Sequence, residues 1–193
     1  MTREPTFAGL VSLACHDMRT PLATVHGFAR TLAKADLPDP APKYVEMIEA
    51  ASAQISELVA ELAVAARIES GSYAPVLKEV DSLALARGSA ELLGEERVTV
   101  AGTGAPVRVD EASLRRGFSA LVQSALRHGG FDHVDVAVNG PVLTVTPVTP
   151  ASALVLTGGE YRDLGAAVAV IVIRGLGGEI AVEGGTLRVR LPQ

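Results

Sequence analysis

The sequence predicts an α + α/β chain, in which a helical hairpin over residues 1–71 precedes an α/β sandwich over residues 72–193. Apolar residues recur at intervals of three and four through residues 7–65, the spacing that gives a helix one apolar face. After Gly71 the pattern changes to short segments of alternating apolar and polar residues, separated by shorter helical segments. Such an order is typical of a mixed α/β domain.

The first helix is predicted over residues 7–32. Pro21 interrupts it, because proline has no N–H and its ring clashes with the carbonyl of Asp17, at a cost of about 3 kcal/mol in an ordinary helix. Pro21 could therefore mark the end of the helix, but the periodicity continues and favours a kinked helix instead. The apolar positions that define the periodicity are Phe7, Val11, Ala14, Met18, Leu22, Val25, Ala29 and Leu32.

The second helix follows a short polar connection. Residues 36–42 contain three prolines and two aspartates, with Asp39 as a candidate cap and Pro40 as a candidate first-turn residue. The helix is expected to end at Gly71. Its heptad seam consists of Tyr44, Ile48, Ala51, Ile55, Leu58, Leu62 and Ala65. Because a lone hairpin leaves this stripe in water, we expect a homodimer in which two copies of residues 6–70 form a four-helix bundle.

One histidine on the first helix stands apart from the apolar stripe. His16 lies within Ala-Cys-His-Asp-Met-Arg-Thr-Pro-Leu at residues 14–22, two residues from both Ala14 and Met18, so it points away from the core. A neutral imidazole can attack phosphorus through one ring nitrogen while a carboxylate such as Asp17 orients the proton on the other. Thr20, one turn further on the same face, could position a water or a phosphoryl oxygen.

These residues resemble the phospho-accepting H-box of bacterial sensor histidine kinases, and residues 6–71 resemble that family's whole HisKA-type dimerisation and phosphotransfer hairpin. The resemblance implies that His16 is the phosphorylated nucleophile and that Asp17 assists its phosphorylation. It also implies that Thr20 assists dephosphorylation of the partner. The docking surface for a response-regulator receiver domain would include Arg19, Ala23, Gly27 and Thr31.

Residues 72–193 are predicted to form one sheet with helices on one face. Strands are expected over residues 76–80, 97–101, 107–109, 133–138, 142–146, 179–182 and 186–191, with Asn139 and Gly140 as a tight turn. Helices are expected over residues 82–93, with Asp81 or Ser82 as the cap, over residues 111–128 and over residues 164–174. The inward face of the helix over 111–128 consists of Leu114, Phe118, Leu121, Val122 and Ala125.

The order of these elements resembles the Bergerat-type, HATPase-like domain of the same kinases over about residues 76–191, with a degenerate nucleotide site. Ser124 stands where the family has a magnesium-binding asparagine, and a serine hydroxyl reaches less far than an amide carbonyl. Residues 146–151 lack the acid and the glycines of the adenine-binding box. The lid is expected to be shortened to residues 152–162. Gly165 alone remains of the phosphate-binding glycines, and Asp163 would place a negative charge where a polyphosphate should lie.

The composition limits the partners of the chain. It has 48% hydrophobic residues, yet no apolar run approaches the ~18–20 residues that cross a bilayer. A formal net charge of −5 without a basic cluster argues against nucleic acid as the main partner. The single cysteine, Cys15, and the lack of a signal-peptide pattern in residues 1–10 favour the cytoplasm. His128 and His133 have no ligand pattern around them, so we expect surface residues and no metal site.

These features predict a histidine phosphotransferase of a two-component phosphorelay, in which His16 shuttles a phosphoryl group between response-regulator aspartates. The architecture is most similar to that of dimeric histidine phosphotransferases of the ChpT type. Such a chain would bind no cofactor of its own, because the partner receiver domain supplies Mg²⁺. Two alternatives stay open, a diverged ATP-dependent histidine kinase and a non-catalytic pseudokinase that binds a receiver domain as a scaffold.

Overall fold

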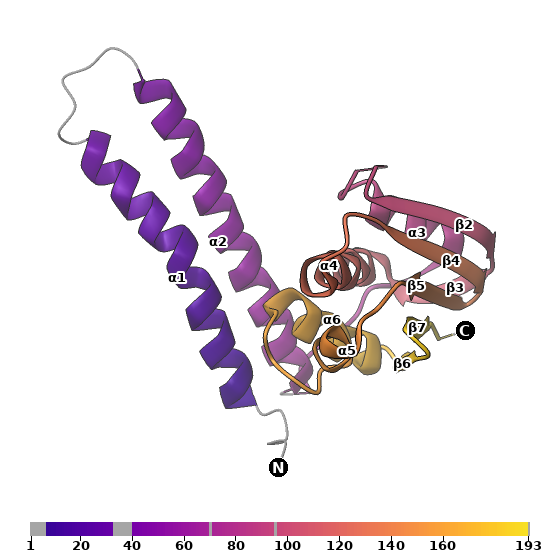
Figure 1. Ribbon diagram of the computed structural model, residues 1–193. Coiled ribbons are helices and arrows are strands. Elements are labelled where there is room, and N and C mark those ends of the chain that lie inside the picture. Colours follow the sequence, from indigo (N-terminus) through magenta and orange to yellow (C-terminus); the bar gives the residue numbers. More distant parts are fainter. Residues whose placement is uncertain (1–6, 33–39, 70, 95, 193) are drawn as a thin grey trace.

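The computed structural model describes residues 7–32, 40–69, 71–94 and 96–192. α1 (Phe7–Leu32) and α2 (Ala41–Glu69) form a helical hairpin, and α2 lies between α1 and the α/β part of the chain (Figure 1). The carbonyl of Pro40 accepts hydrogen bonds from the N–H groups of Lys43 and Tyr44, so α2 begins just after Pro40 and does not include it. The predicted cap Asp39 lies outside the described residues.

α1 continues through Pro21 to Leu32, so the prediction that the helix runs past Pro21 is confirmed and the alternative that Pro21 ends it is wrong. Every residue of the predicted seam on α2 is buried or half-buried. Phe7 and Leu22 of the α1 stripe nevertheless remain 45% and 53% exposed. These side chains, together with the exposed Val45, Met47 and Val59 of α2, are apolar surface that a second hairpin would cover.

The described residues contain seven strands, which form two separate sheets. The larger sheet has the order β2 (Val98–Gly104), β4 (Val134–Gly140), β5 (Val142–Thr146), β7 (Thr186–Arg190) and β6 (Glu179–Glu183), with β2 parallel to β4 and the other pairs antiparallel. β1 (Leu77–Asp81) and β3 (Pro106–Asp110) pair only with each other. The prediction of a single sheet is therefore wrong. The hydroxyl of Ser82 joins the two sheets, since it donates to the carbonyl of Gly140 (2.6 Å) and accepts from the N–H of Ala105 (3.0 Å).

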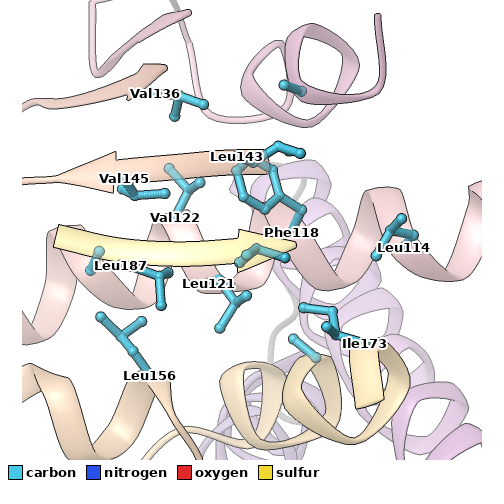
Figure 2. Close-up of a cluster of buried hydrophobic side chains, with 14 of the residues drawn as sticks. Leu114, Phe118, Leu121, Val122, Val136, Leu143, Val145, Leu156, Ile173 and Leu187 are labelled. Carbon is cyan, nitrogen blue, oxygen red and sulfur yellow. The ribbon is translucent and has the colours of Figure 1, made fainter. Parts of the chain in front are cut away.

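The sandwich core lies between the larger sheet and its helices. α3 (Ser82–Ala90) begins at the predicted cap Asp81, whose carboxylate accepts from the N–H of Ala84. α4 (Glu111–Gly129) packs its predicted inward face against the strands, and Figure 2 shows Phe118, Leu121 and Val122 close to Leu143, Val145 and Leu187 in the same cluster. Alternate residues of β4 and β5 are buried, as expected for strands with one face on a core.

One helix was not expected from the sequence. Residues 150–156 form α5 (Pro150–Leu156), which starts with a capping box: Thr149 Oγ1 accepts from the N–H of Ser152 (3.2 Å), and Ser152 Oγ accepts from the N–H of Thr149 (3.1 Å). Val155 and Leu156 enter the sandwich core. The expectation of a lid beginning at residue 152 is therefore wrong, because the first half of that segment is a helix packed on the core.

α6 (Leu164–Gly175) joins the hairpin to the sandwich. A helix that is apolar all round must be buried all round, and α6 packs on two sides. One side belongs to the sandwich core through Ala166, Ala169, Val170 and Ile173. The other side packs with Leu10, Ala14 and Ala65 of the hairpin through Leu164, Ala167, Val168 and Val172.

The segment after α2 is tied to the start of α4 through one carboxylate. Tyr73 donates its hydroxyl to Asp110 Oδ2 (3.2 Å), and the N–H of Val76 donates to the same oxygen (3.2 Å). Asp110 Oδ1 caps α4 by accepting from the N–H of Ser113 (3.1 Å). Burial raises the pKa of Asp110, but the backbone hydrogen bonds from Ser113 and Val76 outweigh it and hold the pKa below its ordinary value. Burial also raises the pKa of Tyr73.

We expect Asp110→Ala to lower the free energy of unfolding by about 1–2 kcal/mol at neutral pH, because a helix cap and two further donors lose their acceptor. The folded-state pKa of Asp110 is lowered, so its contribution is present above the carboxyl pKa of the unfolded chain and is lost as the pH falls through the folded-state value. Urea unfolding of wild type and variant at neutral and at strongly acidic pH measures this difference.

The matched control is Asp132→Ala, since Asp132 is exposed and has no hydrogen-bond partner among the described residues. It should leave stability nearly unchanged at both pH values. An Asp110→Ala effect of the same size at neutral and acidic pH would contradict the role given to the ionised carboxylate.

Candidate functional site

His16 projects from α1 into solvent, with 74% of its side chain exposed. Ala14 is buried and Met18 is half-buried on the opposite side of the helix, in the cluster that joins α1, α2 and α6. The prediction that His16 points away from the apolar stripe is confirmed. A partner protein can therefore reach its imidazole without any change in the core.

Asp17 sets the chemical state of the ring. His16 Nδ1 lies 3.1 Å from Asp17 Oδ1, and the carboxylate is itself mostly covered. An ionised carboxylate only accepts hydrogen bonds, so this contact assigns the proton to Nδ1; in the neutral imidazole the other ring nitrogen, Nε2, then has the lone pair. The geometry leaves His16 with an available nucleophilic nitrogen and a carboxylate that can stabilise positive charge on the ring.

One exposed face of α1 continues from the histidine toward the end of the helix. Spacings of three and four place five exposed residues on it, which we call the His16 face: His16, Thr20, Ala23, Gly27 and Thr31. The Thr20 hydroxyl makes no hydrogen bond to any residue that the structure describes, whereas Thr31 donates to the carbonyl of Gly27 (2.9 Å). A Cβ added at Gly27 would meet nothing within 4 Å. The side chain of Arg19 lies outside the described residues.

The residues predicted as remnants of a nucleotide site lie in the sandwich. Ser124 is fully buried on α4, and in the described part of the chain its Oγ alone among buried side-chain oxygens and nitrogens has no hydrogen-bond partner. Asp163 caps α6 through the N–H of Ala166 (3.1 Å), and its other oxygen lies 3.3 Å from both Arg127 Nη1 and His128 Nε2. His128, predicted as a surface residue, is half-buried, with 24% of its side chain exposed.

α4 and α6 touch along small residues, which we call the α4–α6 seam: Gly117, Ala120, Gly165 and Ala169. A Cβ on Gly165 would lie 3.1 Å from the Cβ of Ala120, and a Cβ on Gly117 would lie 3.4 Å from the Cα of Ala169. The same four residues line a cavity of about 470 Å³ that α2 also borders. A hard cation needs several oxygen ligands, and the glycines and alanines of the seam offer no side-chain oxygen.

The structure therefore divides the predicted site residues into two groups. His16, Asp17 and Thr20 come together on α1 with Ala23, Gly27 and Thr31, while Ser124 and Gly165 lie on α4 and α6 inside the sandwich. Within the residues that the structure describes, no group of three or more His, Cys, Asp or Glu is placed to hold a metal ion. No helix in the same part of the chain is long and apolar enough to cross a bilayer.

Comparison with known proteins agrees with this division. Residues 8–71 match the family model of the His Kinase A (phospho-acceptor) domain, whereas no curated protein matches the chain. Histidine kinase AdeS of Acinetobacter baumannii has a similar structure, with a TM-score of 0.69 at 16% identity over 92% of this chain and 97% of that one.

Two further solved structures are similar. Full-length ShkA in complex with AMPPNP has a TM-score of 0.54 at 22% identity, over 98% of this chain and 46% of that one. Histidine kinase ThkA in complex with response regulator protein TrrA has a TM-score of 0.55 at 18% identity, over 94% of this chain and 60% of that one. At these identities the likeness shows the fold.

The hairpin is thus a phospho-acceptor domain of the histidine kinase type, as the sequence predicts. The whole chain has the α + α/β fold of histidine kinases, with an HATPase-like sandwich after the hairpin. These findings support a role in two-component signalling.

We expect Pro21→Ala to raise the free energy of unfolding by about 1–3 kcal/mol, because alanine restores an N–H that can donate to the carbonyl of Asp17 and relieves the clash of the ring. Urea unfolding followed by circular dichroism measures the change. Pro42→Ala is the matched control, since Pro42 lies in the first turn of α2, where no helical hydrogen bond is lost. An unchanged or lowered stability of Pro21→Ala would contradict the cost assigned to Pro21.

Proposed function

We propose that this protein is a histidine phosphotransferase of a two-component phosphorelay, in which His16 receives a phosphoryl group from one response-regulator aspartate and passes it to another. The observation that carries the proposal is a contrast within one chain. His16 is exposed and oriented by Asp17, whereas the seam between α4 and α6 consists of glycine and alanine, which offer no side-chain oxygen to the metal ion of a nucleotide.

In the proposed reaction, Nε2 of His16 attacks the phosphorus of a receiver aspartyl phosphate in line with the leaving carboxylate oxygen. The N–P bond forms as the P–O bond to the aspartate breaks, and the aspartate leaves as a carboxylate. Asp17 accepts the hydrogen bond from Nδ1–H and so stabilises the positive charge that develops on the imidazole. Attack by the aspartate of a second receiver reverses these steps, with Mg²⁺ held by the receiver domain.

The His16 face would be the docking surface for the receiver. Ala23 and Gly27 are small, so a partner can approach the backbone of α1 closely just beyond the histidine. The free hydroxyl of Thr20 lies one turn from His16, where it could hold a phosphoryl oxygen or a water that hydrolyses the partner's phosphate. The fold relative ThkA has been solved with a response regulator, which supports a partner of this class.

The same proposal includes a homodimer through residues 6–70 and a likeness in function to relay phosphotransferases of the ChpT type. Dimerisation would cover the exposed apolar residues of the hairpin, which include Leu22, Val45 and Val59. The alternative of a diverged ATP-dependent kinase requires a nucleotide site that the residues around Gly165 and Ser124 do not supply. A pure scaffold would need neither the contact between His16 and Asp17 nor the free hydroxyl of Thr20.

Phosphotransfer can be tested with receiver domains of the source organism, each labelled by radioactive acetyl phosphate, freed of it, and mixed with the protein and Mg²⁺. We expect label to pass from at least one receiver to the protein in an acid-labile, base-stable linkage, which is typical of phosphohistidine. His16→Gln should abolish the transfer, while His133→Gln, which changes an exposed histidine of the sandwich, should not. Asp17→Ala should slow it by about 10²-fold.

Transfer of label to His16→Gln at the wild-type rate would show that another residue accepts the phosphoryl group. Transfer from no receiver would also contradict the proposal and would favour the scaffold.

A further inference from the structure

The hairpin and the sandwich meet along α6. Leu164 and Ala167 of α6 pack in one cluster with Leu10 and Ala14 of α1 and with Ala65 of α2, and none of these five side chains is more than 2% exposed. Side chains this completely covered are close-packed. Moving α6 away from the hairpin would therefore bring apolar surface from all three helices into water.

A glycine allows α6 to lie directly on α2. Gly175 is the last residue of α6, and a Cβ added to it would lie 3.0 Å from Cγ2 of Ile68. That separation is shorter than an ordinary carbon–carbon contact. Gly175 is also exposed, so a large side chain at this position would push the two helices apart without entering the sandwich core.

The chain between α2 and β1 is a second attachment, and we call its residues 71–76 the brace. It leaves α2 through a Schellman motif, in which the N–H of Gly71 donates to the carbonyl of Ile68 (3.0 Å) and the N–H of Ser72 donates to the carbonyl of Arg67 (2.9 Å). Gly71 has a φ of +68°, the left-handed conformation that this motif requires. Backbone hydrogen bonds therefore fix the direction in which the brace leaves the hairpin.

The other end of the brace is bound to the sandwich. The hydroxyl of Tyr73 lies within hydrogen-bonding distance of Asp110 Oδ2 (3.2 Å) and Ser113 Oγ (3.1 Å), and the N–H of Val76 donates to the same carboxylate oxygen (3.2 Å). β1 begins directly after Val76, and its partner strand β3 ends at Asp110. The brace is thus hydrogen-bonded to both of the parts that it connects.

The brace and α6 act on the same junction. α4 faces α2 across the cavity of about 470 Å³, so the close contact between the hairpin and the sandwich is the one made by α6. A short connection of defined shape raises the effective concentration of the two faces of this contact for each other. It does so only for the arrangement that the connection fits.

We propose that the sandwich is a fixed support for the phospho-acceptor helix. In this proposal α6 and the brace keep the two parts in one arrangement, and the α6 cluster orders the turn of α1 that carries His16. Ala14 and Met18, two residues before and after His16, both belong to that cluster. The fixed arrangement does not depend on the source of the phosphoryl group, but the further consequence that loosening it slows phosphotransfer rests on the proposed function.

Double electron–electron resonance on the full chain measures the arrangement. Cys15, the single cysteine, is replaced in Cys15→Ser, and spin labels are attached in Ala53→Cys on α2 and Ala137→Cys on β4, two exposed positions. An excess of unlabelled chain ensures that only distances within one chain contribute. We expect one narrow distance distribution. A broad distribution, or two separate distances, would overturn the proposal.

A wedge between the helices tests the support. Gly175→Trp should broaden the distance distribution and should speed amide hydrogen exchange of residues 14–18 by about tenfold. The matched control is Ala181→Trp, which places the same side chain on an exposed position of β6 and should change neither measurement. Unchanged distances and unchanged exchange in Gly175→Trp would overturn the proposal.

The brace is tested in the Gly175→Trp background. Adding Tyr73→Phe should broaden the distribution further, because the brace loses its hydroxyl contact with α4. Adding Tyr44→Phe, at the other end of α2, should have no effect. A narrow wild-type distribution in a protein that accepts no label from any receiver would contradict the proposed function and still support the fixed arrangement.

Discussion

The rest of the structure depends on the two-sided packing of α6. One side of this helix enters the sandwich core, and the other side meets Leu10, Ala14 and Ala65 of the hairpin. Each valine or leucine that α6 buries stabilises the fold by about 1.5–3 kcal/mol relative to its exposed state. Exposing either side of α6 to water would therefore destabilise the protein. The phospho-acceptor hairpin and the sandwich are therefore held together by one apolar helix.

The start of α6 bears on the source of the phosphoryl group. In a chain with a working nucleotide site, His16 would draw its phosphoryl group from within. Here Asp163 places a carboxylate at the start of α6, 3.3 Å from both Arg127 and His128. A polyphosphate brought to the same place would meet this carboxylate. Under the proposed function, the exposed imidazole of His16, beside Asp17, exchanges its phosphoryl group with an external aspartyl phosphate.

Much of the fold could be predicted because the decisive signals are local. Helical periodicity predicted that α1 runs past Pro21, and it also predicted the seam of α2 and the inward face of α4. The residues around His16 indicated the phospho-acceptor site. The pairing of β1 with β3 could not be predicted, since short strands choose partners through contacts distant in sequence. α5 had a local signal, because Thr149 and Ser152 form a capping box around Pro150. A two-turn helix that begins at the end of a segment with three prolines and three threonines, residues 141–150, is nevertheless easily mistaken for a loop.

Contacts between helices that are distant in sequence could not be predicted either. Spacing places Arg116 on α4, but only the packing of α2 near that helix makes Arg116 line a cavity between them. The contact of His128 with Asp163 arises in the same way, because the end of one helix meets the start of another across the fold. The residues around His16 were predictable from local spacing, and the contacts at helix junctions were not.

We propose that the phosphoryl group on His16 comes from outside the chain, because the α4–α6 seam offers no side-chain oxygen to a magnesium nucleotide. Titration of MgATP into the wild-type protein tests this proposal most directly. We expect no saturable binding up to millimolar MgATP and no transfer of the γ-phosphoryl group to His16. Saturable one-to-one binding together with labelling of His16 would contradict it.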